Sequence, residues 1–130
     1  MASTYGTDQV DGTSGIASVE FIQEDSVKSS GEFGKIVRSG VPSSTFWHFV
    51  DFSGSGPFAH RESLGTDKVN AFSQVAVSMT ELDSDGNPFL GSAIMTVNNV
   101  VPRANGDIIV RGHIHWDSTL QVRLNYIIVN

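Results

Sequence analysis

The chain has 130 residues, no cysteine, and 14 aspartate and glutamate residues against eight lysine and arginine residues, which gives a formal net charge of −6. This length suits a single domain with its own core, and the lack of cysteine excludes disulfides, thiolate metal sites and cysteine nucleophiles. The acidic balance argues against a nucleic-acid-binding protein, which would normally carry a basic stripe.

The 13 glycines and the many serine, threonine and valine residues favour a turn-rich all-β fold. Residues 1–8 show no positive segment followed by an apolar run, so they indicate no secretory signal. No apolar stretch approaches the roughly 20 residues of a membrane helix, so we expect no membrane insertion. These features fit a cytoplasmic or virion-associated protein, with release by a non-classical route left open, and they do not fix the localisation. Residues 1–16, rich in small and polar residues, predict a flexible arm before a single domain of residues 17–130.

The first half of the chain gives weak strand signals. Short strands are expected at residues 17–22 and 34–38, where apolar and polar residues alternate. Residues 40–44 contain proline and serine and indicate a loop.

Residues 46–52 form the first strong strand candidate. One face carries Phe46, Val50 and Phe52, and the other carries Trp47 and Phe49. Apolar groups on both faces indicate that both are covered, by a second sheet or by another subunit. Glycines and a proline in residues 53–57 end this strand, and residues 58–74 are expected to form a long exposed loop.

Residues 74–82 alternate cleanly and predict a strand whose inward side chains are Val75, Val77 and Met79. Residues 83–88 then predict a turn, and residues 92–99 a return strand. Residues 100–106 are expected to cross over to the last part of the chain, with Asn105-Gly106 as a strong turn signal. About six strands separated by turns predict a β-sandwich or a barrel.

The last 24 residues contain two alternating runs with a short polar break between them, which predicts a closing β-hairpin. The expected core side of the first run is Ile108, Val110, Gly112, Ile114 and Trp116. The expected core side of the second run is Leu120, Val122, Leu124, Tyr126 and Ile128. The opposite face then places His113, His115 and Asp117 side by side.

Two clusters of polar residues have the composition of possible metal-binding sites. Two imidazoles and a carboxylate at His113, His115 and Asp117 could bind zinc, iron or manganese, although a polar outer face explains them better. Residues 83–87 resemble the front half of a calcium loop, but the glutamate that completes such a loop is missing, which favours a turn. No serine lies in a nucleophile elbow. We therefore expect no cofactor, no metal and no enzymatic activity.

Trp116 and Asp117 suggest a different kind of chemistry. An aromatic ring can stack on the C–H face of a sugar while a neighbouring carboxylate accepts hydrogen bonds from its hydroxyls. The alternation with Val110 and Ile114 favours a core position for Trp116, with Asp117 at the rim.

The second half of the chain resembles the H-type lectin domains, the family typified by the snail and discoidin agglutinins. The resemblance covers residues 75–129 and depends on the order of four motifs, which are VAVSMTELD, AIMTVNNV with Pro102, IHWDST and VRLNYIIV. It implies a six-stranded antiparallel β-sandwich that assembles as a homotrimer. It also implies a lectin that binds galactose or N-acetylgalactosamine-type glycans between subunits, as an agglutinin does in cell adhesion.

The same resemblance implies the site residues. The family residue after the corner tryptophan contacts sugar, which points to Asp117 beside Trp116 and His115. The family's binding arginine falls at or near Ser92, so this chain departs from the pattern there. The family also has a sugar-binding Gly-x-Asp motif. Residues 65–67 match this motif in residue type but not in their distance from the other motifs, and they add Asp67 to the expected site. The cysteines of secreted members are absent.

The trimer has a second basis in the last strand, where Ile127 and Val129 lie on the face opposite the core set and are typical of an interface. A closed trimer would also cover the doubly apolar strand at residues 46–52. Two alternatives stay open. The fold could serve as a structural or host-attachment module, as in a phage tail or capsid, without a working sugar pocket. A metal-dependent enzyme built on His113 and His115 is the other.

Overall fold

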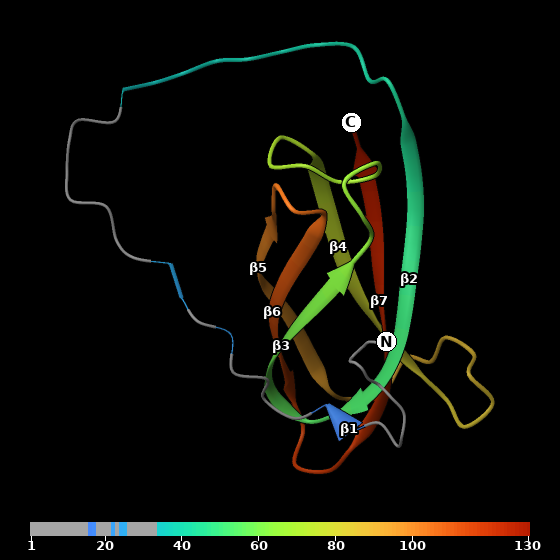
Figure 1. The fold of residues 1–130 in the computed structure, drawn as a ribbon. Coiled ribbons are helices and arrows are strands. Elements are labelled where there is room, and N and C mark those ends of the chain that lie inside the picture. Colours follow the sequence, from blue (N-terminus) through green and yellow to red (C-terminus); the bar gives the residue numbers. More distant parts are fainter. Residues whose placement is uncertain (1–15, 18–21, 23, 26–33) are drawn as a thin grey trace.

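The computed structural model describes residues 16–17, 22, 24–25 and 34–130. Within them every regular element is a β-strand, and the strands form two sheets (Figure 1). The strands are β1 (Ile16–Ala17), β2 (Thr45–Gly54), β3 (Gly56–Ser63), β4 (Gln74–Leu82), β5 (Ile94–Pro102), β6 (Asp107–His115) and β7 (Leu120–Val129). The predicted all-β fold class is confirmed. No helix in the described residues is long and apolar enough to cross a membrane.

The strands divide between sheet A, with the order β1-β2-β7-β4, and sheet B, with the order β3-β6-β5. The six long strands pair antiparallel, whereas the two-residue β1 pairs parallel with the end of β2. β1 covers the start of the strand expected at residues 17–22. The rest of that strand at residues 18–21, and residues 1–15 of the expected arm, lie outside the described residues.

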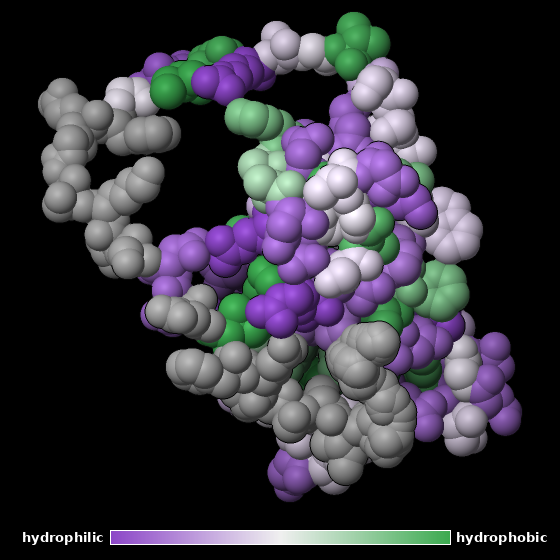
Figure 2. All heavy atoms as spheres, viewed as in Figure 1, coloured by the Kyte–Doolittle hydropathy of each residue, from purple (hydrophilic) through white to green (hydrophobic). Residues whose placement is uncertain are grey.

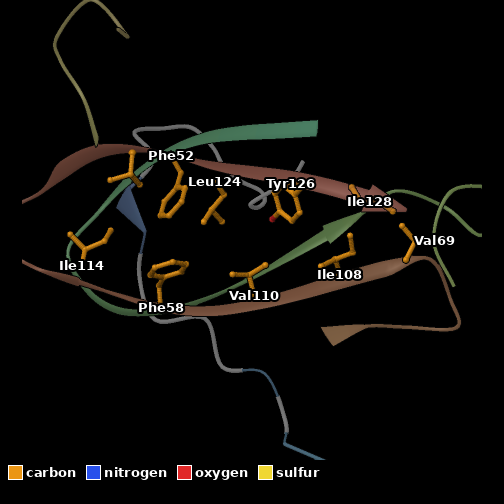
Figure 3. Close-up of a cluster of buried hydrophobic side chains, with 10 residues drawn as sticks. Phe52, Phe58, Val69, Ile108, Val110, Ile114, Leu124, Tyr126 and Ile128 are labelled. Atoms are coloured by element: carbon orange, nitrogen blue, oxygen red, sulfur yellow. The ribbon is translucent and has the colours of Figure 1, made fainter. Parts of the chain in front are cut away.

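The core lies between the buried faces of the two sheets. Figure 3 shows side chains from the two sheets directed toward one another. The predicted inward residues of the last two strands are buried here, namely Ile108, Val110, Ile114, Val122, Leu124, Tyr126 and Ile128. The inward set of β4, which is Val75, Val77 and Met79, packs against this cluster. Gly112 belongs to the same face, and the Phe58 ring occupies the space that a side chain there would fill.

The predicted closing hairpin is wrong. β6 lies in sheet B between β3 and β5, and β7 lies in sheet A between β2 and β4. Residues 116–119 therefore carry the chain from one sheet to the other. Sheets pack roughly 10 Å apart, a distance that four residues can span. The alternation identified the buried face of each run correctly, but it holds no information on which strand lies alongside.

The hairpin that the chain does form joins β5 to β6. Pro102 pairs with Ile108, the Arg103 N–H donates to the Asp107 carbonyl (2.8 Å), and Gly106 has a φ of 93°. The predicted turn at Asn105-Gly106 is confirmed, whereas the predicted crossover is wrong because β5 runs on to Pro102. The turn after β4 is also present, but β4 and β5 belong to different sheets, so they are not a hairpin.

The exposed loop expected at residues 58–74 is wrong in its first part, where β3 pairs with β6 along its whole length. Phe58 and His60 are buried on its inner face. The alternation was hidden because a histidine, an arginine and a glutamate follow one another there. Gly56 has a φ of 75°, which lets the chain leave sheet A and enter sheet B at once. Pro57 is tolerated because β3 is an edge strand.

The strand expected at residues 34–38 is absent, because residues 34–42 have no regular structure and are exposed. Figure 1 shows this segment running apart from the two sheets, and Figure 2 shows apolar side chains on it. Ile36, Val37 and Val41 are its exposed apolar residues. A strand needs a neighbouring strand for its hydrogen bonds, and this segment has none within the described residues.

Candidate functional site

The corner formed by residues 116–119 places two of the predicted sugar-binding residues in solvent. β6 ends at His115, and the Trp116 N–H donates to the Ile114 carbonyl (2.9 Å), which turns the chain at this point. The Trp116 side chain is 42% exposed, and Asp117 is exposed as well. The expected core position of Trp116 is therefore wrong, because the alternation stops where the strand ends.

His113 and His115 lie on the outer face of sheet B, as the alternation predicted. Their ring centroids are 3.7 Å apart and the rings are inclined by 18°, so the two imidazoles are stacked. Stacked rings present their nitrogens side by side and do not direct them at one point. Within the described residues, no group of three or more histidine, cysteine or acidic side chains could hold a metal ion. The described residues thus give no support to a metal-dependent enzyme at this pair.

Ser92 lies at the same end of the molecule as the corner. Ile94 pairs with His115, so Ser92 and Asp117 each lie two residues beyond that pair. Ser92 is exposed. No lysine or arginine occurs in residues 81–94 or 114–121, so the sequence around the corner offers no substitute for the family's binding arginine.

Asp67 lies at the other end of β6. The N–H groups of Leu64 and Gly65 both donate to the carbonyl of Gly106, which fixes the loop of residues 64–73 beside the β5–β6 turn. β6 has nine residues, and at about 3.3 Å per residue it separates that turn from Trp116 by roughly 30 Å. One chain therefore does not bring Asp67 to the corner, and only a second copy could supply it there.

Sequence reasoning missed a groove beside the turn after β4. It has a volume of about 400 Å³ and is lined by Met79, Thr80, Glu81, Pro88, Phe89, Leu90, Gly91, Ala93 and Met95. The Glu81 carboxylate and the Phe89 ring both lie against Gly91, where a side chain would collide with them. The exposed Phe89-Leu90 pair after a polar turn was the available signal, since such apolar pairs in solvent often mark binding surfaces.

The outer face of sheet A carries a second feature, which we call the Trp47 face and define by Trp47, Phe49 and Ile127. These side chains are 72%, 44% and 55% exposed. The Trp47 and Phe49 rings are parallel within 4°, with centroids 5.9 Å apart, and Trp47 pairs across the sheet with Ile127. The face of this strand that carries Phe46, Val50 and Phe52 is covered by the core, as expected, whereas the Trp47 face is exposed in the single chain.

An ion pair borders the Trp47 face on one side. Arg123 bonds to both carboxylate oxygens of Asp51, through Nε at 2.7 Å and through a terminal nitrogen at 3.1 Å. The Arg123 guanidinium also lies 4.5 Å from the centre of the Phe49 ring, a cation–π distance. The hydrogen bond with Asp51 raises the pKa of Arg123. This pair holds the Phe49 end of the face in a fixed arrangement.

A part-buried network of hydrogen bonds links β2 to β3. His48 Nε2 lies 2.6 Å from one carboxylate oxygen of Glu62, and His60 Nε2 lies 2.9 Å from the other. Burial raises the pKa of Glu62, but the hydrogen bonds from His48 and His60 outweigh burial and lower that pKa to about 2. Sequence reasoning missed the network because His48 is 14 positions from Glu62 and the strand β3 was not expected.

Comparisons with protein-family models, with curated proteins and with solved structures give no match for this chain. Of the predicted sugar-binding residues, the structure brings Trp116, Asp117, His115 and Ser92 to one end and leaves Asp67 at the other.

Proposed function

We propose that this protein is a lectin that binds galactose or N-acetylgalactosamine-type glycans and has no enzymatic activity. The observation that carries the proposal is the exposed Trp116 ring with Asp117 beside it at the end of β6. A solvent-facing aromatic ring next to a carboxylate offers a sugar both a stacking surface and a hydrogen-bond acceptor. The resemblance to H-type lectin domains leads to the same corner by an independent route.

The proposed lectin acts as a homotrimer with β-sandwich subunits. Two observations support assembly, which are the exposed Trp47 face and the separation of Asp67 from the corner. Copies joined through the Trp47 face bury three large apolar side chains that are otherwise in water. A neighbouring copy is also the source from which Asp67 could reach a corner site. Three shallow sites then bind a multivalent glycan surface through avidity.

The test is a glycan array and a titration calorimetry measurement on the Asp117→Ala variant. A lost hydrogen bond to a charged group costs about 1.5–3 kcal/mol, so the affinity for the preferred glycan should fall roughly 10- to 100-fold. Asp85→Ala is the matched control, because it removes an exposed carboxylate from the neighbouring turn. Equal affinity of Asp117→Ala and the unmodified protein would contradict the site.

A structural or host-attachment trimer without a sugar pocket is the second candidate. The observation that favours it is the lack of any lysine or arginine in residues 81–94 and 114–121, whereas the family pattern has its binding arginine at or near Ser92. In that case light scattering should give a trimer mass while the glycan array shows no binding at all. A trimer that binds a galactose-type glycan would exclude this candidate.

A further inference from the structure

One carboxylate holds two histidines that reach it from different sheets. His48 is on β2 of sheet A, whereas His60 and Glu62 are on β3 of sheet B. An ionised carboxylate can only accept hydrogen bonds, so both imidazole Nε2 atoms carry their hydrogen here. The network of His48, Glu62 and His60 therefore connects the two sheets through side chains, toward the end of β3 that lies away from the turn between β2 and β3.

The surroundings of the network are mainly apolar. His60 is 1% exposed, and its ring is stacked on Phe52 with an angle of 1° between the planes. The strand β6 places Val110 and Ile108 opposite His60 and Glu62, and both are buried. The strand β7 places Tyr126 against His48, with the ring centroids 5.6 Å apart. From these neighbouring strands, the titratable group that faces the network is the buried phenol of Tyr126.

Protonation changes the balance of charge inside this enclosure. With Glu62 ionised, one protonated imidazole makes the network neutral, and a second gives it a net positive charge. Burial lowers the pKa of His60 even though Glu62 acts to raise it, so the enclosure opposes a cation at His60. A histidine with a lowered pKa takes up its proton more readily in the unfolded chain. The folded state therefore loses stability as the pH falls below about 6.5.

We propose that His48, Glu62 and His60 form a pH-sensitive link between the two sheets, which stabilises the fold at neutral pH and is weakened when His60 is protonated. Glu62 acts in the same direction at lower pH. Its stabilising effect is fully present above pH 4.5 and is lost as the pH falls toward 2. Acid thus weakens the contact between β2 and β3 in two steps, first through His60 and then through Glu62.

The experiment is urea unfolding of the full chain between pH 7.5 and pH 4.5, with His60→Phe and His113→Phe as variants. Phenylalanine can keep the stack on Phe52 and does not titrate. We expect the unmodified protein to lose up to about tenfold in its folding constant for each pH unit below 6.5. His60→Phe should lose much of this dependence, whereas His113→Phe, which changes a half-buried histidine on the outer face of sheet B, should retain it.

Two results would overturn the proposal. One is a folding constant of the unmodified protein that does not change between pH 7.5 and pH 4.5. The other is a His60→Phe variant with the pH dependence of the unmodified protein. If His60→Phe does not fold, the ring titration of His60 by NMR in the unmodified protein decides. A pKa below the usual 6.5 supports the link, and a pKa at or above it overturns the link.

Discussion

Replacing Trp47 with alanine tests whether the Trp47 face joins copies of the chain. The Trp47 side chain is 72% exposed, so it leaves roughly 150–180 Å² available for burial. At about 25 cal/mol per Å² this area is worth roughly 4 kcal/mol in each subunit, as an upper limit. Alanine retains a small part of that area, which leaves a loss of roughly 3 kcal/mol. Three subunits then lower the formation constant of a trimer by roughly a millionfold.

The assay is light scattering coupled to size exclusion at micromolar concentration. We expect a trimer mass for the unmodified protein and a monomer mass for Trp47→Ala. Trp116→Ala is the matched control, since it removes another exposed tryptophan that lies at the corner and not on the sheet face. Far-UV circular dichroism should be the same for both variants, because Trp47 points away from the core.

An unchanged trimer mass for Trp47→Ala would refute the assignment of this face. A monomer mass for the unmodified protein would refute the proposed assembly as a whole. Loss of assembly in Trp116→Ala with none in Trp47→Ala would move the contact to the corner. These three outcomes are distinguishable in a single series of runs.

Two further predictions concern stability. Gly112→Ala places a methyl carbon 2.6 Å from the Thr96 carbonyl oxygen and 2.8 Å from the Phe58 ring. The free energy of unfolding should therefore fall by about 1–3 kcal/mol. A urea midpoint equal to that of the unmodified protein would mean that Phe58 moves aside freely. Gly106 and Gly86 have similar positive φ angles, 93° and 81°. The added methyl of Gly106→Ala would lie 2.4 Å from the Gly65 backbone, whereas that of Gly86→Ala would have no atom within 4 Å. Gly106→Ala should therefore lower the thermal midpoint more, and equal losses would contradict the contact between the β5–β6 turn and Gly65.

The buried face of each strong strand could be predicted from alternation alone. Ile108, Val110 and Ile114 on β6 are buried as expected, because a strand with one face in a core must place apolar residues at every second position. The pairing of the strands could not be predicted in this way. Each strand finds its partner through backbone hydrogen bonds, which leave no mark on the side-chain pattern. This is why β6 and β7 were paired with each other when they lie in different sheets.

β3 was missed for a different physical reason. His60 and Glu62 read as loop residues because buried histidine and glutamate are unfavourable without partners. Glu62 bonds to both His60 and His48, and His48 lies on the preceding strand and becomes a neighbour when the chain turns at Gly56. A sequence pattern scores each residue by its own polarity. It therefore cannot anticipate a polar group that is accepted in the interior because another polar group meets it there.

The candidate site depends on where strands end, which alternation does not reveal. In the sequence, Trp116 continues the alternation that marks the inward residues of β6. In the structure, β6 ends at His115 and the Trp116 ring is exposed to solvent. The motif resemblance points to this corner, which is exposed, and also to Asp67, which lies roughly 30 Å away in the same chain. An exposed Trp47 face and a site whose expected residues lie at both ends of β6 have one common explanation. That explanation is the trimer proposed above, in which one copy contributes the Trp116 corner and its neighbour the loop that carries Asp67.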